Sequence, residues 1–359
     1  MNKIDKTTRQ QYRTKVEEKF PDDLELGSVR FHKKFPMRYG ENPGYPAAFY
    51  QELGATGPNM ATFKILQEGS KGLSYINVGD MDLGQRLARK LTSIFKTRSI
   101  CVLIKHEMPS GVAMGDTPIA AFEKAWKSDP LSNFGSVDVF NQAVDEEVAH
   151  QIVDKMRNVE VIYAPGYTPE ALAILSTRKP LRVIQMGAPC QEISHDADLE
   201  FKRVAGGLLV QKRFDSRIVS ANSVDVVSRR RPSPDELDAA VFNWNVACFT
   251  RSNAIVIGQK DKAHGIGSGQ RSRIDAAEDA IRLSHRGYGP QGCVMASDAF
   301  MPFTDVVEIA AKNKITAIIY PLGSIRDEEV IAKADELRIA MIVTKKANET
   351  DSERCFLHR

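Results

Sequence analysis

The feature that most constrains the fold is a regular alternation of short apolar runs with longer helical patterns. The run 100–104 is five residues long, rich in β-branched side chains and stopped by charge at Lys105, which is typical of a buried strand. The segment 80–96 instead carries apolar residues at helical spacing. Because strands that alternate with helices form βαβ units, the sequence predicts a three-layer α/β fold.

The same interpretation extends along the whole chain. In the first half we expect strands at 100–104, 137–140, 159–163 and 181–186, and helices at 80–96, 117–127, 146–157 and 170–177. In the second half we expect strands at 206–211, 254–257, 293–296, 317–320 and 339–343, and helices at 235–249, 274–283, 306–313 and 327–337. Glycine-rich turns are expected at 109–115 and 264–270, and a basic loop at 32–36.

The second half repeats the plan of the first. Each half has an apolar strand, a glycine-rich segment, a helix and then further strand and helix pairs, which predicts two copies of one α/β unit with a site between them. The polar segment 187–200 interrupts the pattern. The expected domains are therefore 31–190 and 200–359, preceded by a charged, helix-capable N-terminal extension at 1–30.

Composition excludes several classes of protein. The net charge of +3 is too small to indicate nucleic-acid binding, although it suits a local site for a small anion. The five cysteines are scattered without a CxxC spacing, so neither a disulfide framework nor a zinc site is expected. The polar N-terminus carries no signal region, and no run of 18 uncharged apolar residues indicates a membrane span. We expect a cytoplasmic protein.

Lys105 and His106 are the first candidates for chemistry. They follow directly on the strand 100–104, and ligands of open α/β sheets bind at the carboxyl ends of strands. A proton-transfer group beside a cation is a candidate catalytic pair, whereas the alternative is a solvated loop. Zinc deaminase chemistry would need H-x-E and P-C-x-x-C. The chain has neither, since Glu107 follows His106 directly and Cys190 has no second cysteine, so no metal is expected.

Other segments offer binding chemistry. Arg38 lies beside Tyr39 and Gly40 in a turn-rich loop, which suits an anion but also an ordinary surface arginine. Asn253 precedes a strand and either orients a ligand or caps a turn. The apolar loop 300–303 is either core or a stacking wall for a flat ring. The tail 354–359 carries arginine, phenylalanine and histidine, which suits docking into a site.

These segments together resemble the AICAR transformylase part of the bifunctional purine-biosynthesis family that also carries IMP cyclohydrolase. The matching segments run in family order from about residue 30 to the C-terminus: 38–43, 104–111, 129–135, 164–167, 252–254, 265–273, 297–300, 323–327 and the Arg-x-Phe tail. One such motif would be weak evidence, but this many in the same order is highly specific.

The resemblance implies two duplicated cytidine-deaminase-like three-layer α/β/α domains without zinc, and a homodimer with sites at the subunit interface. It implies transfer of a formyl group from 10-formyltetrahydrofolate, a co-substrate, to the 5-amino group of AICAR, giving FAICAR. No room for a cyclohydrolase domain precedes residue 30, so we expect a stand-alone transformylase without IMP cyclohydrolase activity. The alternatives are another formyl donor, or a non-catalytic AICAR-binding protein, against which the presence of Lys105 and His106 argues.

Residue roles also follow from the resemblance. His106 is expected to be the general base, Lys105 to stabilise the oxyanion or protonate the leaving folate nitrogen, and Asn253 to lie near the reacting groups. The expected AICAR-binding residues are Arg38, Tyr39, Asn77, Arg354 and His358. The expected folate-binding residues are Phe134, Ile266, Phe300 and Asp305. The chain departs from the family at Met108 and Ser110, where asparagine and cysteine are usual.

Overall fold

The computed structural model describes residues 19–27, 29–55, 59–70, 72–190, 199–213, 216, 218 and 220–344. The strands are β1 (Asp23–Leu26), β2 (Val29–Pro36), β3 (Ala48–Glu52), β4 (Lys64–Gln67), β5 (Ser99–Lys105), β6 (Met108–Gly115), β7 (Val137–Phe140), β8 (Val161–Ala164), β9 (Arg182–Gln185), β10 (Leu199–Val204), β11 (Gly207–Lys212), β12 (Asp225–Val226), β13 (Ile255–Gln259), β14 (Lys262–Gly267), β15 (Val294–Ser297), β16 (Ala317–Tyr320) and β17 (Ala340–Val343). The helices are α2 (Tyr75–Ile94), α3 (Pro118–Ser128), α4 (Glu146–Val153), α5 (Pro169–Ser176), α6 (Pro234–Ala247), α7 (Arg273–Ser284), α8 (Asp305–Lys312), α9 (Asp327–Glu336) and the 3₁₀ turn η1 (Ala221–Ser223).

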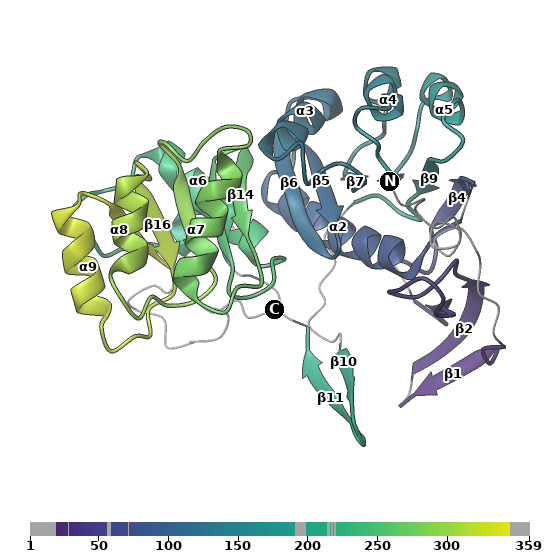
Figure 1. The fold of residues 1–359 in the computed structure, drawn as a ribbon, viewed down its shortest axis with the longest axis horizontal. Coiled ribbons are helices and arrows are strands. Elements are labelled where there is room, and N and C mark those ends of the chain that lie inside the picture. Colours follow the sequence, from purple (N-terminus) through teal and green to yellow (C-terminus); the bar gives the residue numbers. More distant parts are fainter. Residues whose placement is uncertain are drawn as a thin grey trace, which may run out of the picture.

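The large sheet of the described residues consists of two copies of one five-stranded unit (Figure 1). In the first copy, β5 pairs antiparallel with β6 and β7, and β8 and β9 follow in parallel. In the second copy, β13 pairs antiparallel with β14 and β15, and β16 and β17 follow in parallel. An antiparallel edge strand completes each copy, β4 beside β9 and β12 beside β17. The identical order confirms the predicted duplication; the domain boundaries stay a prediction.

The two copies join edge to edge into twelve continuous strands. At this seam Lys262 of β14 lies opposite Ala113 of β6, and the Met114 N–H donates to the carbonyl of Asp261 at 2.8 Å. Helices α2 and α6 cover one face, while α3–α5 and α7–α9 cover the other (Figure 1). One apolar core lies under α2 and α6 across both copies, with the rings of Phe95 and Phe242 6.2 Å apart. The structure is therefore a three-layer α/β fold.

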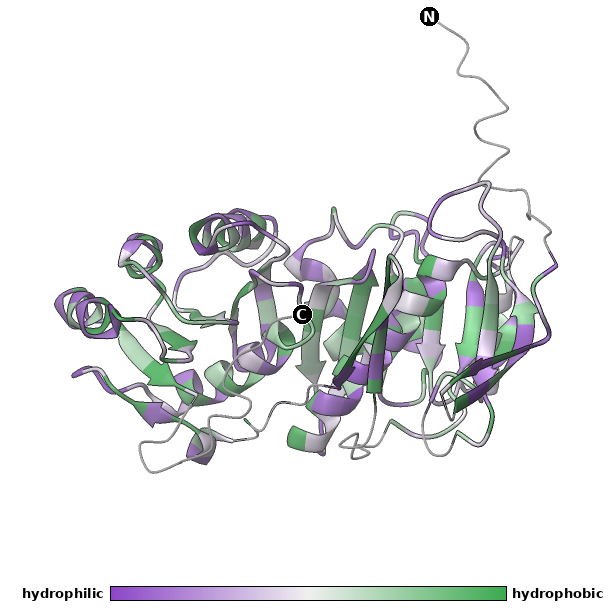
Figure 2. Cartoon of the chain, turned by 90° about the horizontal axis from the view of Figure 1, so that it is seen from below, coloured by the Kyte–Doolittle hydropathy of each residue, from purple (hydrophilic) through white to green (hydrophobic). Residues whose placement is uncertain are grey.

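The helices begin where local chemistry predicts. Side-chain oxygens of six N-cap residues accept the orphan backbone N–H three residues on: Ser74, Thr117, Asp145, Thr168, Ser233 and Ser272. The predicted capping box of Ser233 and Glu236 is present. The apolar strands lie between helices whose outer faces are hydrophilic (Figure 2). None of the described helices combines the length and apolar character that crossing a membrane requires.

The two segments predicted as glycine-rich turns are strands instead. Residues 109–115 belong to β6, and the segment 264–270 begins inside β14. A Cβ atom at Gly111 would stand 2.4 Å from the carbonyl oxygen of Ala125, and one at Gly265 would stand 2.0 Å from that of Ala280. The glycines therefore mark close approach of helices α3 and α7 to the strands, which is the other meaning of glycine inside a strand.

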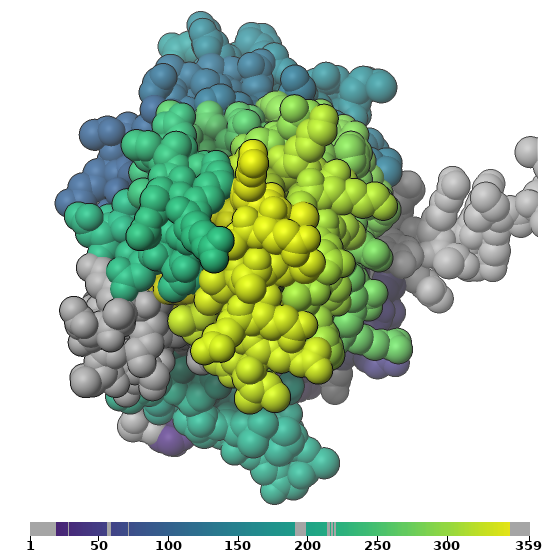
Figure 3. Space-filling model, turned by 90° about the vertical axis from the view of Figure 1, so that its left-hand side faces the viewer, coloured from purple at the N-terminus to yellow at the C-terminus, as the bar shows by residue number. Residues whose placement is uncertain are grey.

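Two further expectations are wrong. The predicted basic loop 32–36 is part of β2, which pairs with β3 and whose Phe35 packs against Phe49 and Phe63. Part of the predicted helix-capable extension 1–30 forms β1, although 1–18 lie outside the described residues. The polar segment 187–200 ends in β10, whose pairing with β11 forms a hairpin that projects from the body of the protein (Figures 1 and 3).

Replacing Gly265 by alanine should destabilise the fold. The new methyl group would collide with helix backbone, which cannot rotate away as a side chain could, so we expect a loss of about 1–3 kcal/mol in unfolding free energy. Gly207→Ala in β11 is the matched control, since its methyl group would meet only ordinary contact at 3.5 Å. Urea unfolding of both variants measures the difference, and equal stability of G265A and wild type would contradict the packing argument.

Candidate active site

A cavity of about 290 Å³ lies at the seam between the two copies. Its walls come from the β5–β6 hairpin, from β14, and from the segments at helices α3 and α7. The lining residues are Lys105, His106, Met108, Pro109, Ser110, Ser128, Asp129, Ser132, Ala263, His264, Gly265, Ile266, Ser268, Gln270, Asp279 and Leu283. The duplication therefore places one cavity between equivalent hairpins, where the repeat predicted a site.

Two equivalent β-bulges turn residues toward this cavity. In the first copy, Leu103 pairs with Gly111 and Ile104 with Pro109, which leaves Ser110 as the extra residue. In the second copy the register skips His264 in the same way. Bulges bend a strand and redirect side chains, and they are frequent beside active sites. Ser110 and His264 both line the cavity, so each copy contributes its bulge residue to it.

The Lys105 ammonium is held in place by two backbone carbonyls. Its Nζ donates to the carbonyl of Phe134 at 3.0 Å and to that of Gly135 at 2.8 Å. Gly135 has a φ of 83°, and a Cβ there would stand 2.6 Å from Nζ, so both backbone and space favour glycine. The lysine therefore presents a fixed positive charge at the end of β5.

His106 lies at the tip of the β5–β6 hairpin. Lys105 pairs with Met108, so His106 and Glu107 alone form the turn, with φ angles of 52° and 59°. The Glu107 N–H donates to Oδ1 of Asp80 at 2.6 Å. Asp80 belongs to α2 and is buried, and this burial raises the pKa of its carboxyl group to about 7. We expected Pro109 and Gly111 to turn the chain; the turn instead precedes them.

Arg38, Tyr39 and Asn77 gather at the N-terminal end of α2. The buried Arg38 donates from Nη2 to the Tyr39 hydroxyl at 2.8 Å, and its guanidinium lies 4.4 Å from the centre of that ring. The Asn77 side chain closes a capping box with Ser74. Asn77 precedes Asp80 by three residues, about one helical turn. This group, the Arg38 cluster, is thus linked through α2 to the His106 turn, although it does not line the cavity.

Arg182 belongs with the Arg38 cluster and was missed by sequence reasoning. Burial lowers the pKa of its guanidinium, and the positive charge of Arg38 lowers it further. The carboxylate of Glu160 lies 3.5 Å away, and Nε of Arg38 has no hydrogen-bond partner among the described residues. Arg182 also donates from Nε to the Gly72 carbonyl at 3.0 Å. Two buried guanidinium groups beside one carboxylate carry an excess of positive charge, which favours an anion. A charge inside the predicted strand 181–186 was the available signal.

Both ends of the Asn253 side-chain amide are hydrogen bonded within the protein. Its Nδ2 donates to the carbonyls of Gln270 and Arg271 at 3.0 and 3.1 Å, and its Oδ1 accepts from Arg273 at 2.7 Å. Arg273 also bonds the buried Asp298. Asn253 therefore reaches the cavity only through Gln270, which lines it.

Only some of the expected folate-binding residues lie at the cavity. Ile266 lines the cavity, and Phe134 contributes its carbonyl to Lys105 while half of its side chain is exposed. Phe300 and Asp305 lie outside the cavity lining, with Asp305 at the start of α8. Arg354 and His358 lie outside the described residues. Thus, of the expected site residues, the cavity itself brings together Lys105, His106 and Ile266.

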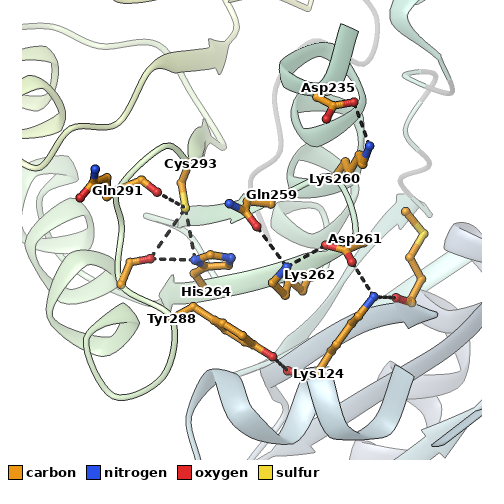
Figure 4. Close-up of polar contacts among 12 residues, drawn as sticks. Lys124, Asp235, Gln259, Lys260, Asp261, Lys262, His264, Tyr288, Gln291 and Cys293 are labelled. Atoms are coloured by element: carbon orange, nitrogen blue, oxygen red, sulfur yellow. Dashed lines mark hydrogen bonds and ion pairs between the residues drawn. The ribbon is translucent and has the colours of Figure 1, made fainter. Parts of the chain in front are cut away.

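His264 is a second residue that sequence reasoning missed, since it was taken only as the start of a glycine-rich turn. Its Nδ1 lies 2.7 Å from the Gly289 carbonyl and 3.3 Å from Cys293 Sγ (Figure 4). Its Nε2 is buried without a hydrogen-bond partner among the described residues, and its ring centre lies 4.9 Å from that of Tyr288. Burial lowers the pKa of this imidazole.

Ion pairs across the seam fix the two copies beside this site. Lys124 of α3 lies 2.6 Å from the carboxylate of Asp261, and its backbone carbonyl accepts from the Tyr288 hydroxyl (Figure 4). Arg286 bonds the carboxylate of Asp129, which lines the cavity, at 3.0 Å. The cavity is therefore bounded by paired charges. Within the described ranges, no three His, Cys, Asp or Glu side chains are grouped to hold a metal ion.

His264→Leu should flatten the pH dependence of stability. The pKa of His264 is lowered in the folded state, so the unfolded chain takes up a proton first as the pH falls below about 6.5, and folding weakens. Wild type should lose up to about 1.4 kcal/mol per pH unit more than H264L in that window. Urea unfolding at pH 7.5, 6.5 and 5.5 measures the slopes. His150→Gln, at an exposed position, is the control that should keep the wild-type slope.

A family model described as AICARFT/IMPCHase bienzyme matches residues 2–283 of the 359-residue chain. The matched range contains Lys105, His106 and the Arg38 cluster, and it ends at Leu283, the last residue that lines the cavity. The match confirms the family resemblance drawn from the motifs. The chain belongs to the AICARFT/IMPCHase bienzyme family, whose members are enzymes of purine biosynthesis.

Proposed function

We propose that this chain is an AICAR formyltransferase that transfers the formyl group of 10-formyltetrahydrofolate to the 5-amino group of AICAR. The observation that carries the proposal is the fixed presentation of Lys105 and His106 to a cavity at the seam. A protein that only bound AICAR would have no need of a proton acceptor beside an immobilised cation.

The chemistry assigns one task to each residue. The AICAR amine is conjugated into its ring and is a weak nucleophile, so its attack needs a base. His106 accepts the amine proton as the new nitrogen–carbon bond forms. Lys105 stabilises the negative oxygen that develops on the formyl carbon. The bond from that carbon to N10 of the folate then breaks, and the proton passes to N10, which gives FAICAR and tetrahydrofolate.

The Arg38 cluster supplies the nucleotide site of the proposal. Two buried guanidinium groups, those of Arg38 and Arg182, suit the phosphate, because arginine binds phosphate through paired N–H groups. Tyr39 and Asn77 lie beside Arg38 and are assigned to AICAR. From the tail, we keep Arg354 as a proposed phosphate-binding residue and His358 as a proposed AICAR-binding residue.

The folate side and the assembly complete the proposal. Phe134 and Ile266 lie next to Lys105 and in the cavity, respectively, where they suit a flat ring. Phe300, Asp305 and Asn253 are assigned to the site by resemblance. We propose that the active unit is a homodimer, in which a second copy of the chain supplies those residues that its own cavity lacks.

The direct test mixes the purified full chain with AICAR and 10-formyltetrahydrofolate in the absence of ATP. We expect FAICAR to form, and chromatography detects it. Product that appears only with formate and ATP would overturn the folate donor. The absence of product under both conditions would overturn the enzymatic function and favour an AICAR-binding protein.

The role of His106 has its own test. His106→Ala should lower kcat by about 10²–10⁴-fold, because the amine loses its base, while AICAR binding changes little. His150→Ala is the matched control, since that histidine is exposed on α4 and does not line the cavity. Steady-state kinetics and calorimetric AICAR binding measure the two effects. Near-normal turnover of H106A would remove His106 from the mechanism.

A further inference from the structure

The hairpin tip that carries His106 has an unfavourable backbone. His106 and Glu107 are consecutive non-glycine residues in the left-handed region, with φ of 52° and 59°. Turns of this kind normally use asparagine and glycine, because a Cβ atom crowds the backbone there. The equivalent turn of the second copy, Lys260–Asp261 between Gln259 and Lys262, has no positive φ. The hairpin itself therefore does not require the left-handed conformation.

One buried carboxylate accounts for that conformation. Oδ1 of Asp80 accepts the Glu107 N–H at 2.6 Å, and the backbone of His106 also lowers the pKa of this carboxyl group. Asp80 is only 3% exposed and belongs to α2, a different element from the hairpin. The hydrogen bond from Glu107 thus ties the left-handed turn to the carboxylate, and other backbone angles at this tip would break it.

Burial of this carboxylate is unfavourable in itself. Loss of water is the main cause that raises the pKa of Asp80, the neighbouring Glu107 carboxylate adds to it and Lys105 opposes it, and the resulting pKa is about 7. No Lys or Arg within the described ranges forms an ion pair with Asp80 within 4 Å. The backbone of the His106–Glu107 turn, and above all the Glu107 N–H, therefore supplies most of the compensation for this charge. Costly groups of this kind concentrate where a site needs fixed geometry.

We propose that Asp80 is a positioning residue for the Lys105–His106 pair: its carboxylate fixes the left-handed His106–Glu107 turn, so that both side chains reach the cavity in one arrangement. The catalytic consequence rests on the proposed function, whereas the effect on the turn does not.

A substitution at Glu107 can show whether Asp80 acts by holding the turn or in some other way. A Cβ atom at Gly79 would stand 2.6 Å from Glu107 Oε1, so the Glu107 carboxylate packs onto α2 next to Asp80. Glycine at position 107 adopts a positive φ without crowding and also removes that like charge. If Asp80 acts by holding the turn, Glu107→Gly should lessen the need for it.

The kinetic test is a double-mutant cycle of Asp80→Asn and Glu107→Gly. We expect D80N to lower kcat by about 10–100-fold, as loss of an orienting partner does, with KM for AICAR within about threefold of wild type. When Asp80→Asn is added to the E107G variant, kcat should fall by at most a third of the factor by which D80N lowers it in the wild-type protein. Asp82→Asn, on the same helix but partly exposed beside Arg86, is the matched control and should keep wild-type kcat.

The structural test needs no activity. Amide hydrogen exchange of the segment 104–109 should be at least tenfold faster in D80N than in wild type, and glycine at 107 should reverse part of that increase. The melting temperature of D80N at pH 8 should not fall, because the amide removes a buried charge that is unfavourable above pH 7.

Each failure has a separate meaning. Unchanged exchange in D80N, no coupling to Glu107→Gly, or a D80N protein that does not fold at pH 8 would each overturn the positioning role. A wild-type chain without formyltransferase activity would overturn the proposed function instead, and hydrogen exchange would still decide whether Asp80 holds the turn.

Discussion

The whole arrangement depends on how closely helices α3 and α7 approach the strands β6 and β14. Helix backbone occupies the space where side chains of Gly111 and Gly265 would stand. This contact brings the alanine-lined surfaces of the helices onto the strands and leaves the cavity between the two hairpins. Ser110 and His264 precede these glycines as bulge residues, so the same close packing determines which side chains face the seam.

Much of the fold could be predicted because burial and periodicity act locally. The strands Val137–Phe140 and Ala317–Tyr320 have the predicted bounds, and the helices begin within a few residues of their predicted starts. The glycine-rich segments were misassigned because glycine permits both a turn and a close backbone contact. Local sequence cannot distinguish the two, since the second depends on alanines of a helix that follows in the chain, such as Ala125 and Ala280.

The site was less predictable than the fold. Lys105 and His106 were found because charge stops an apolar strand, which is a local signal. Arg182, Asp80 and His264 gave only weak signals, since their roles arise from partners more than 20 residues away. A buried charged residue indicates a functional site only when the groups that compensate its charge are known. The motif resemblance supplied the Arg38 loop, Asn253 and the folate residues, which spacing alone left open.

The hairpin tip of the second copy serves a different purpose from that of the first. Where the first copy has His106 and Glu107, the second has Lys260 and Asp261, and the Asp261 carbonyl and carboxylate bind Met114 and Lys124 across the seam. One tip therefore joins the two copies of the unit, whereas the other carries His106 to the cavity. A duplicated unit joined in this way gains a second wall for its cavity, and the tip that makes the joint is no longer equivalent to the tip that carries His106.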